Sequence, residues 1–184
     1  EDPNITKQKE VKLVKSSELD EIPTDYFVLT DLEIKNKPNK DEAEFINDLV
    51  DKTKALFDGN NEWRDDTRFT GFRELHQKYA GEDFQPSTEK LVEFILEKGG
   101  LPNINSFVDV YNAISAYTGV SIGAHDISKV NGHAKLEILK EDKDFVTITE
   151  GELGNAKKDE YAYTDDRGIL CRLDIKQGAR TKVS

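Results

Sequence analysis

The spacing of apolar residues changes once along this chain, from a helical period to a period of two. Between residues 41 and 118, apolar side chains recur at the spacing that places them on one face of an α-helix. From residue 134 onward they alternate with polar side chains, as in Ala134, Leu136 and Ile138, which is typical of a strand with one buried face. Helices that precede strands in this way predict an α+β fold with a largely antiparallel sheet.

The helical segment predicts four helices, each bounded by residues that begin or end a helix. Their ranges are Asp41 to Phe57, Trp63 to Tyr79, Pro86 to a stop at Gly99, and Ser106 to a stop at Gly119. Ser106 and Asp109 resemble a capping box, so we expect Ser106 to cap the last of these helices.

Strands are predicted on both sides of the helices. Their ranges are 11–14 at an edge, 26–34, 134–138, 145–149, 161–163 and 169–175. Residues Asp165 to Gly168 predict a hairpin turn before the last strand. In that strand we expect Cys171 on the apolar face and Arg172 on the polar face.

The length of 184 residues suits one ordinary domain. We expect residues 1–62 to form a strand and helix extension that packs on a domain of residues 63–184, the whole being one globular unit. The chain contains no methionine, even at position 1, and it stops directly after a strand-like stretch. Its natural start and the end of the domain are therefore both in question.

Composition excludes several classes of function. The net charge of −11 predicts no strong non-specific nucleic-acid binding, which requires clustered Lys and Arg. No apolar run is long enough for a membrane span. The single cysteine, Cys171, permits no internal disulfide and suits a reducing compartment, so we expect a cytoplasmic protein. Scattered histidines and the absence of a glycine-rich phosphate loop predict neither a metal nor a cofactor.

Four segments, taken in order, resemble the B3/4 domain family. They are Pro86–Leu91 (P-S-x-E-x-L), Val108–Asn112 (V-D-x-x-N), Ser121–Asp126 (P-x-G-A-x-D in stand-alone members, with Ser121 at the Pro position) and Asp166–Arg172 (D-x-G-x-x-C-R). The likeness extends over roughly residues 63–183. The family includes the editing domain of the β subunit of phenylalanyl-tRNA synthetase, so the resemblance implies an α+β B3/4 fold.

The resemblance also implies a function and its partner. In the synthetase, this domain hydrolyses tyrosine wrongly attached to the phenylalanine tRNA. A stand-alone member is therefore expected to act in tRNA editing, binding RNA and deacylating mischarged aminoacyl-tRNA or a related aminoacyl ester in trans. The signature Asn corresponds to Asn112, whereas the Pro and His of the synthetase segment correspond to Ser121 and Gly123. The editing Glu falls near Ala179 or Arg180.

These departures leave two alternatives open, and with them the question of whether the chain is an enzyme. One is a non-catalytic pocket that binds a small amino-acid-like ligand or a nucleotide. The other is an interaction module whose acidic surface engages a basic partner.

Two candidate residues lie on the helix that ends at Gly119. Asn112 shares a face with Val108, and its amide either pins the backbone of the next loop or contacts the amine or carbonyl of a ligand. Ser115, one turn further on, is expected to line the same cleft.

The glycine-containing loop after this helix supplies three more candidates. Gly123 lets a ligand or a strand approach the backbone closely. His125 is either a base or donor, or a packing residue. Asp126 either contacts a ligand or caps the turn at Ile127 and Ser128.

The late strand and the residues after it supply the basic candidates. Arg172 either clamps a carboxylate or phosphate of a ligand or forms a cross-strand ion pair. Together with Arg180 and Lys182 it is expected to form a small basic island. We expect Cys171 to be a buried thiol that packs as a small apolar residue and is not a nucleophile. We expect the Asn112 helix, the glycine loop and the Arg172 strand to meet around one hollow.

Overall fold

The computed structural model describes residues 9–184 and divides the chain into two compact units. The strand unit comprises residues up to Leu29 together with His125–Val183, and the helical unit comprises Thr30–Ala124 with Ser184. The helical unit is therefore inserted, in chain order, between two parts of the strand unit. The predicted boundary at residue 62 and the predicted union of the whole chain into one globular unit stay predictions.

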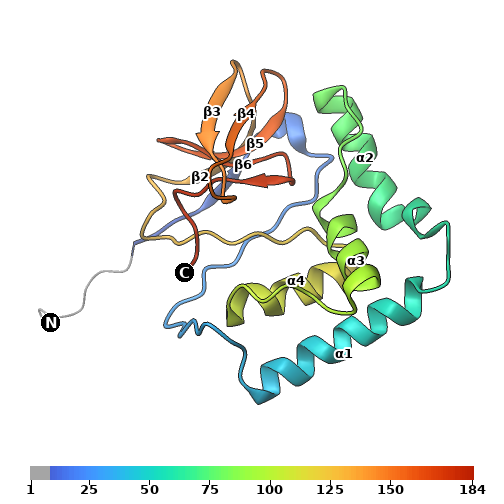
Figure 1. Cartoon of the computed structure of the whole chain (residues 1–184). Helices are drawn as coiled ribbons and strands as arrows, with labels where there is room; N and C mark the ends of the chain where they lie inside the picture. Colours follow the sequence, from blue (N-terminus) through green and yellow to red (C-terminus); the bar gives the residue numbers. More distant parts are fainter. Residues whose placement is uncertain (1–8) are drawn as a thin grey trace, which may run out of the picture. The chain divides into compact units, whose positions relative to one another are not determined.

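Helices make up the ordered elements of the helical unit (Figure 1). They are α1 (Lys40–Phe57), the 3-10 helix η2 (Trp63–Asp65), α2 (Thr67–Ala80), α3 (Ser87–Lys98) and α4 (Ser106–Thr118). The predicted ranges of α1, α3 and α4 are confirmed. The helix predicted within Trp63 to Tyr79 is present as α2, which ends at its C-cap Gly81, but it begins later than Trp63. The side chain of Asp66 accepts a hydrogen bond from the Arg68 N–H at 2.9 Å and caps its start.

The cap of α4 also differs from the prediction. Asn105, in an extended conformation, is the N-cap, and its Oδ1 accepts from the Val108 N–H at 2.9 Å. Ser106 does not cap the helix, and Asp109 Oδ1 instead accepts from the Ile104 N–H at 2.8 Å. Asparagine is as effective a cap as serine, so Asn105, one residue before Ser106, takes this role.

Aromatic rings form the centre of the helical core. Phe57, at the end of α1, packs against Trp63 and Phe69, and the last two rings meet edge to face with centroids 5.5 Å apart. Val92 and Ile95 of α3 complete this cluster and are fully buried. Because α1, α2 and α3 all contribute, their apolar faces fix the position of α3 within the unit.

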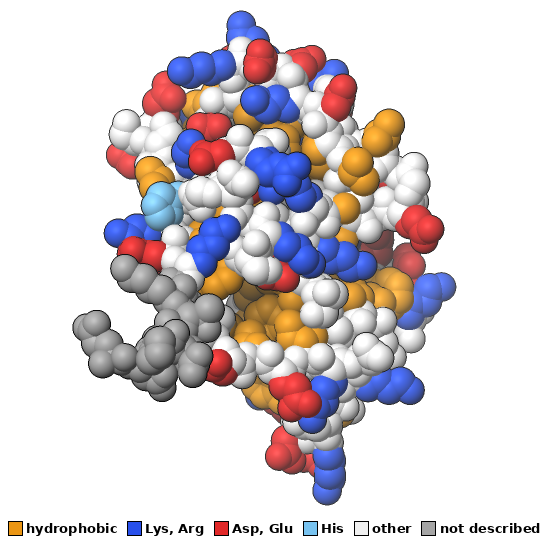
Figure 2. All heavy atoms as spheres, turned by 90° about the vertical axis from the view of Figure 1, so that its left-hand side faces the viewer, with side chains coloured by type: hydrophobic (Ala, Val, Ile, Leu, Met, Phe, Trp, Pro, Cys, Tyr) orange, Lys and Arg blue, Asp and Glu red, His pale blue; other side chains and the backbone are white. Residues whose placement is uncertain are grey.

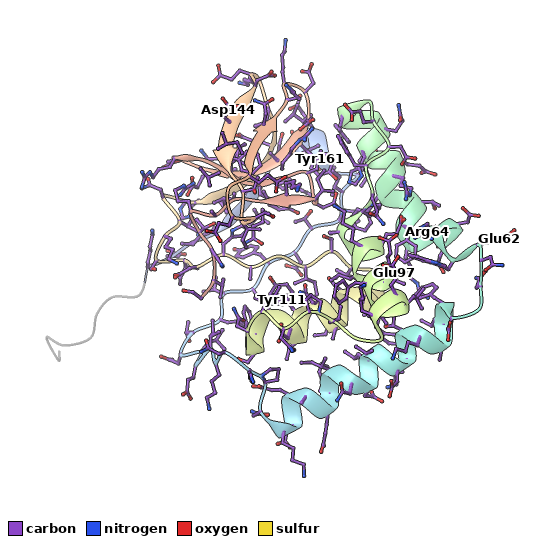
Figure 3. The ribbon with its side chains drawn as sticks, viewed as in Figure 1. Glu62, Arg64, Glu97, Tyr111, Asp144 and Tyr161 are labelled. Atoms are coloured by element: carbon purple, nitrogen blue, oxygen red, sulfur yellow. The ribbon has the colours of Figure 1, made fainter. Side chains whose placement is uncertain are left out.

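A buried carboxylate lies in the first turn of α3. The Glu89 side chain is 1% exposed, and Arg73 of α2 contacts both its oxygens, with Nη2 2.7 Å from Oε1 and Nε 3.1 Å from Oε2. Arg64, labelled in Figure 3, adds its Nε at 3.3 Å. Glu89 is the glutamate of the P-S-x-E-x-L segment, so this residue joins α2, η2 and α3 through charge.

The strand unit contains one mixed sheet and a separate two-stranded pair (Figure 1). Its elements are β1 (Leu13–Lys15), the 3-10 helix η1 (Ser17–Leu19), β2 (Ala134–Ile138), β3 (Lys143–Val146), β4 (Leu153–Ala156), β5 (Tyr161–Asp165), β6 (Gly168–Arg172) and β7 (Lys176–Gln177). The sheet order is β1-β2-β5-β6-β7, and β3 pairs with β4. Only the β1–β2 pair among these described strands is parallel, which confirms the α+β class with a largely antiparallel sheet.

The strand predicted at residues 26–34 is wrong. This segment belongs to no sheet, and the Phe27 side chain is 84% exposed. Asp31, two residues after Leu29, adopts a left-handed backbone with φ 57°, which a continuous strand cannot include. The expectation of one buried face on β6 also fails, because Ile169 and its neighbour Leu170 are both buried.

No helix in the described part of the chain is both long and apolar enough to cross a membrane.

Replacing Glu89 with alanine is expected to destabilise the helical unit strongly. The substitution leaves Arg73 facing a buried site without its carboxylate, and we expect the free energy of unfolding to fall by about 3 kcal/mol. Glu97→Ala, at an exposed position of the same helix (Figure 3), should change it by less than about 0.5 kcal/mol. Denaturant unfolding followed by circular dichroism measures both, and equal losses would contradict this role of Glu89.

Candidate functional site

The predicted site residues are distributed over both units. Asn112, Ser115 and Gly123 belong to the helical unit, and His125, Asp126, Arg172 and Arg180 belong to the strand unit. The geometry of each group is defined within its own unit. That all of them line one hollow stays a prediction.

Ser115 fixes the loop that follows α4. Its buried Oγ donates a hydrogen bond to the Val120 carbonyl at 2.5 Å and accepts one from the Ile122 N–H at 3.1 Å. Gly119 ends the helix with φ 77°, and its N–H donates to the Ser115 carbonyl. The Ser115 hydroxyl therefore shapes the loop, and its place in the lining of a cleft stays a prediction.

The same loop has a second anchor and an open stretch. The hydroxyl oxygens of Ser121 and Ser87 lie 3.2 Å apart, which ties the loop to the start of α3. A β-carbon built on Gly123 would meet no atom within 4 Å. Space therefore exists beside the backbone of Gly123, as the sequence predicts for a glycine that lets another group approach.

Asn112 lies on α4, one turn before Ser115, and is partly buried. Its side-chain amide makes no hydrogen bond with any residue in the range 9–184. The pinning of the next loop, predicted as one alternative for Asn112, is carried out by Ser115. An amide with two donors and one acceptor is thus available on this face of the helix.

His125 begins the second part of the strand unit, and its ring is held by Thr181. Its Nδ1 lies 2.7 Å from the Thr181 Oγ1. Burial lowers the pKa of His125 to about 4, against the opposing effect of Asp165 and with a smaller contribution from Arg180. The ring is neutral near pH 7, which fits the predicted packing role better than that of a base.

Asp126 caps the turn that follows it, as one of its predicted alternatives states. Its Oδ1 accepts from the Ser128 hydroxyl at 2.7 Å and from the Ser128 N–H at 3.0 Å. These bonds lower the pKa of Asp126, with the hydroxyl making the largest contribution. The Asp126 N–H donates to the Thr181 carbonyl at 2.9 Å, so the turn is tied to the end of the chain.

Both candidate arginines bind buried carboxylates of their own unit in a two-pronged manner. Arg172 Nε and Nη2 lie 2.8 and 2.6 Å from the two Glu160 carboxylate oxygens. Arg180 Nη1 and Nη2 lie 2.8 and 2.6 Å from those of Asp165. The ion-pair alternative for Arg172 is thus present. In the predicted basic island, Glu160 and Asp165 offset two of the positive charges.

Asp165 has a second role, since it also builds the predicted hairpin turn. Its Oδ1 accepts from the N–H groups of Arg167 and Gly168, and its Oδ2 accepts from that of Asn131. Burial alone would raise the pKa of Asp165, but Arg180 and these N–H groups outweigh it and lower the pKa. No spacing in the sequence singles out Asp165 or Glu160 as partners of the arginines.

Cys171 is unsuited to nucleophilic attack. Burial raises the pKa of its thiol to about 12, so the reactive thiolate is scarce at neutral pH. The high pKa agrees with the expectation that Cys171 is no nucleophile, but the residue is half-buried and not fully buried as predicted.

Basic and acidic side chains are interspersed over the face shown in Figure 2. Ion pairs of the strand unit include Lys135 with Asp166 at 3.4 Å and Lys129 with Asp126 at 3.5 Å. The described residues 9–184 contain no group of three or more His, Cys, Asp or Glu side chains that could hold a metal ion.

A family model for the B3/4 domain matches residues 78–184, which is more than half of the chain. The match covers α3, α4, the Gly123 loop and β2 to β7. No curated protein matches the sequence.

The low pKa of His125 predicts that stability falls in mild acid. The unfolded chain binds a proton near pH 6.5, whereas the folded chain binds it only near pH 4. The contribution of the neutral His125 ring to the free energy of unfolding is therefore complete above pH 6.5. It is lost as pH falls toward 4, by about 3 kcal/mol at most. His125→Asn should flatten this part of the profile of unfolding free energy against pH. A His125 ring that titrates near pH 6 by NMR in the folded protein would contradict the prediction.

Proposed function

The chain belongs to the B3/4 domain family, and from that premise we propose that it hydrolyses mischarged aminoacyl-tRNA, or a related aminoacyl ester, in trans. The observation that carries this proposal is the uncommitted amide of Asn112. It lies one turn before the serine that fixes the Gly123 loop. A cytoplasmic location and contact with RNA are parts of the same proposal.

Two hydrogen-bond donors suit the developing charge of ester hydrolysis. When water adds to the ester carbonyl carbon, the carbonyl oxygen becomes negatively charged, and donors directed at it stabilise the transition state. The Asn112 amide is one donor. The Gly123 N–H is the other, since it donates to no group among residues 9–184 and lies beside open space.

The remaining steps of the proposed hydrolysis release the two products. Collapse of the tetrahedral intermediate breaks the bond between the carbonyl carbon and the ester oxygen. The proton that the attacking water loses passes to the leaving oxygen, which releases a free amino acid and a hydroxyl-ended product. In this scheme the protein orients the carbonyl and stabilises charge, and water is the nucleophile.

The position of Gly123 favours a second candidate function. The synthetase segment carries a histidine where this chain has Gly123, and the synthetase glutamate falls near Ala179 or Arg180. The Arg180 guanidinium is engaged by Asp165. A site with these replacements suits recognition of a free amino acid or a nucleotide without chemistry.

Hydrolysis of a panel of mischarged tRNAs tests the first function. Asn112→Ala should lower the rate by about a hundredfold, because one donor to the oxyanion is lost. Asn61→Ala, which truncates an exposed asparagine of the same unit, should leave the rate unchanged. The absence of turnover on every tRNA of the panel would remove the hydrolase.

Restoring the family histidine separates the two candidates. Gly123→His places its β-carbon in open space on a backbone without positive φ, so the fold should tolerate it. If the native chain is a slow hydrolase, an imidazole there should raise the rate by about a hundredfold. A native chain without turnover that gains activity on this substitution, and is stabilised by an amino acid or nucleotide in thermal shift, would establish the binding function instead.

A further inference from the structure

A cavity of about 440 Å³ lies within the helical unit. It is bounded by α1, the loop that follows α3 and the first turn of α4. Apolar side chains such as Ile46, Val50 and Leu101 form much of its lining. A volume of this size is within the range of small-molecule sites.

Asp109 is a lining residue with an unusual bonding state. The residue is 2% exposed, and its Oδ1 accepts from the Ile104 N–H at 2.8 Å. Its Oδ2 is buried and accepts no hydrogen bond from any group in residues 9–184. A buried carboxylate oxygen without a donor is costly, so a donor that reaches Asp109 Oδ2 would stabilise the site.

The charged side chains at the cavity indicate which charge a ligand would have. The lining contains the carboxylates of Asp51 and Asp109. One ammonium, that of Lys54, lies beside the lining, 3.9 Å from the position of a β-carbon on Gly99, so the carboxylates outnumber it. Asn47 and Asn103 add side-chain oxygens that accept hydrogen bonds. A cavity with apolar walls and a few hydrogen-bond acceptors suits a ligand that joins a cationic group to a hydrocarbon chain.

We propose that this cavity binds a small organic cation, an ammonium group on a short aliphatic chain, with Asp109 Oδ2 accepting a hydrogen bond from the ammonium. An ammonium fits better than a metal ion, since the described residues bring together no three acidic or metal-binding side chains. The site goes beyond the proposed hydrolysis. Asn112 and Gly123 are not among its lining residues, and α1 lies outside the matched family segment.

NMR titration of the whole chain with n-butylammonium chloride tests the site. We expect saturable shifts of the backbone amides of Gly99, Gly100, Leu101 and Asn103, which line the cavity, and of Ile104, whose N–H donates to Asp109. Neutral n-butanol should bind at least about tenfold more weakly, because it lacks the charge that Asp109 recognises. Potassium chloride at the same concentration should produce no saturable shift there. Equal binding of n-butanol, or shifts confined to other regions, would overturn the proposal.

Three substitutions sharpen the test. Asp109→Asn keeps an acceptor for Ile104 but removes the charge, and n-butylammonium affinity should fall by at least about tenfold. Gly100→Leu should abolish binding, because its β-carbon enters open space at the lining without backbone strain. Gly71→Leu, on α2 and also in open space, is the matched control and should bind as the native chain does.

The outcomes are independent of the proposed hydrolysis. Unchanged affinity in Asp109→Asn, or in Gly100→Leu, would overturn the cation site whatever the chain hydrolyses. If Asp109→Asn does not fold, Gly100→Leu and the comparison with n-butanol decide. Asn112→Ala should bind n-butylammonium normally, so a chain without deacylase activity can still contain this site.

Discussion

Two-pronged pairing of arginine with a buried carboxylate recurs in both units and is the interaction on which the arrangement of elements depends. Glu89 is held by Arg73, Glu160 by Arg172 and Asp165 by Arg180. Each carboxylate side chain is 2% exposed or less. Because an isolated buried charge is strongly unfavourable, each pair requires its two elements to be in register.

These pairs also show how an acidic chain places its charge. The chain has a net charge of −11. Four acidic residues in the range 9–184 are buried, and three of them, Glu89, Glu160 and Asp165, are matched by arginine. The planar guanidinium meets both carboxylate oxygens at once, which a lysine ammonium does not do. The same arginines that a sequence suggests as ligand clamps are therefore used to build the fold.

The sequence predicted what depends on local spacing and missed what depends on distant partners. The helical period located α1, α3 and α4, and the hairpin turn at Asp165 was recognised from its residues. The run at Tyr26–Leu29 has strand composition, but no neighbouring strand exists for it to pair with among the described residues. The composition of one segment can favour a strand, but a strand forms only where a second segment pairs with it.

The candidate site divides in the same way. The family segments pointed to Asn112 and Gly123 as candidates. The sequence did not show that Ser115, and not Asn112, holds the loop after α4, because either side chain can reach that loop from one face of the helix. The partners of Arg172 and Arg180 lie on other turns of the chain among many equivalent acidic residues, so spacing could not distinguish them.

The parallel pairing of β1 with β2 has a consequence for the order of assembly. The bond from the Lys12 N–H to His133 Nδ1 joins residues 121 positions apart, and Leu13 pairs with Ala134. During synthesis on the ribosome, β1 emerges long before its neighbour exists, and the entire helical unit is translated in between. The helices make contacts that are nearer in sequence, so they are expected to form before β1 has a strand to pair with. Until then, this short edge segment is the part of the nascent chain most in need of protection from aggregation.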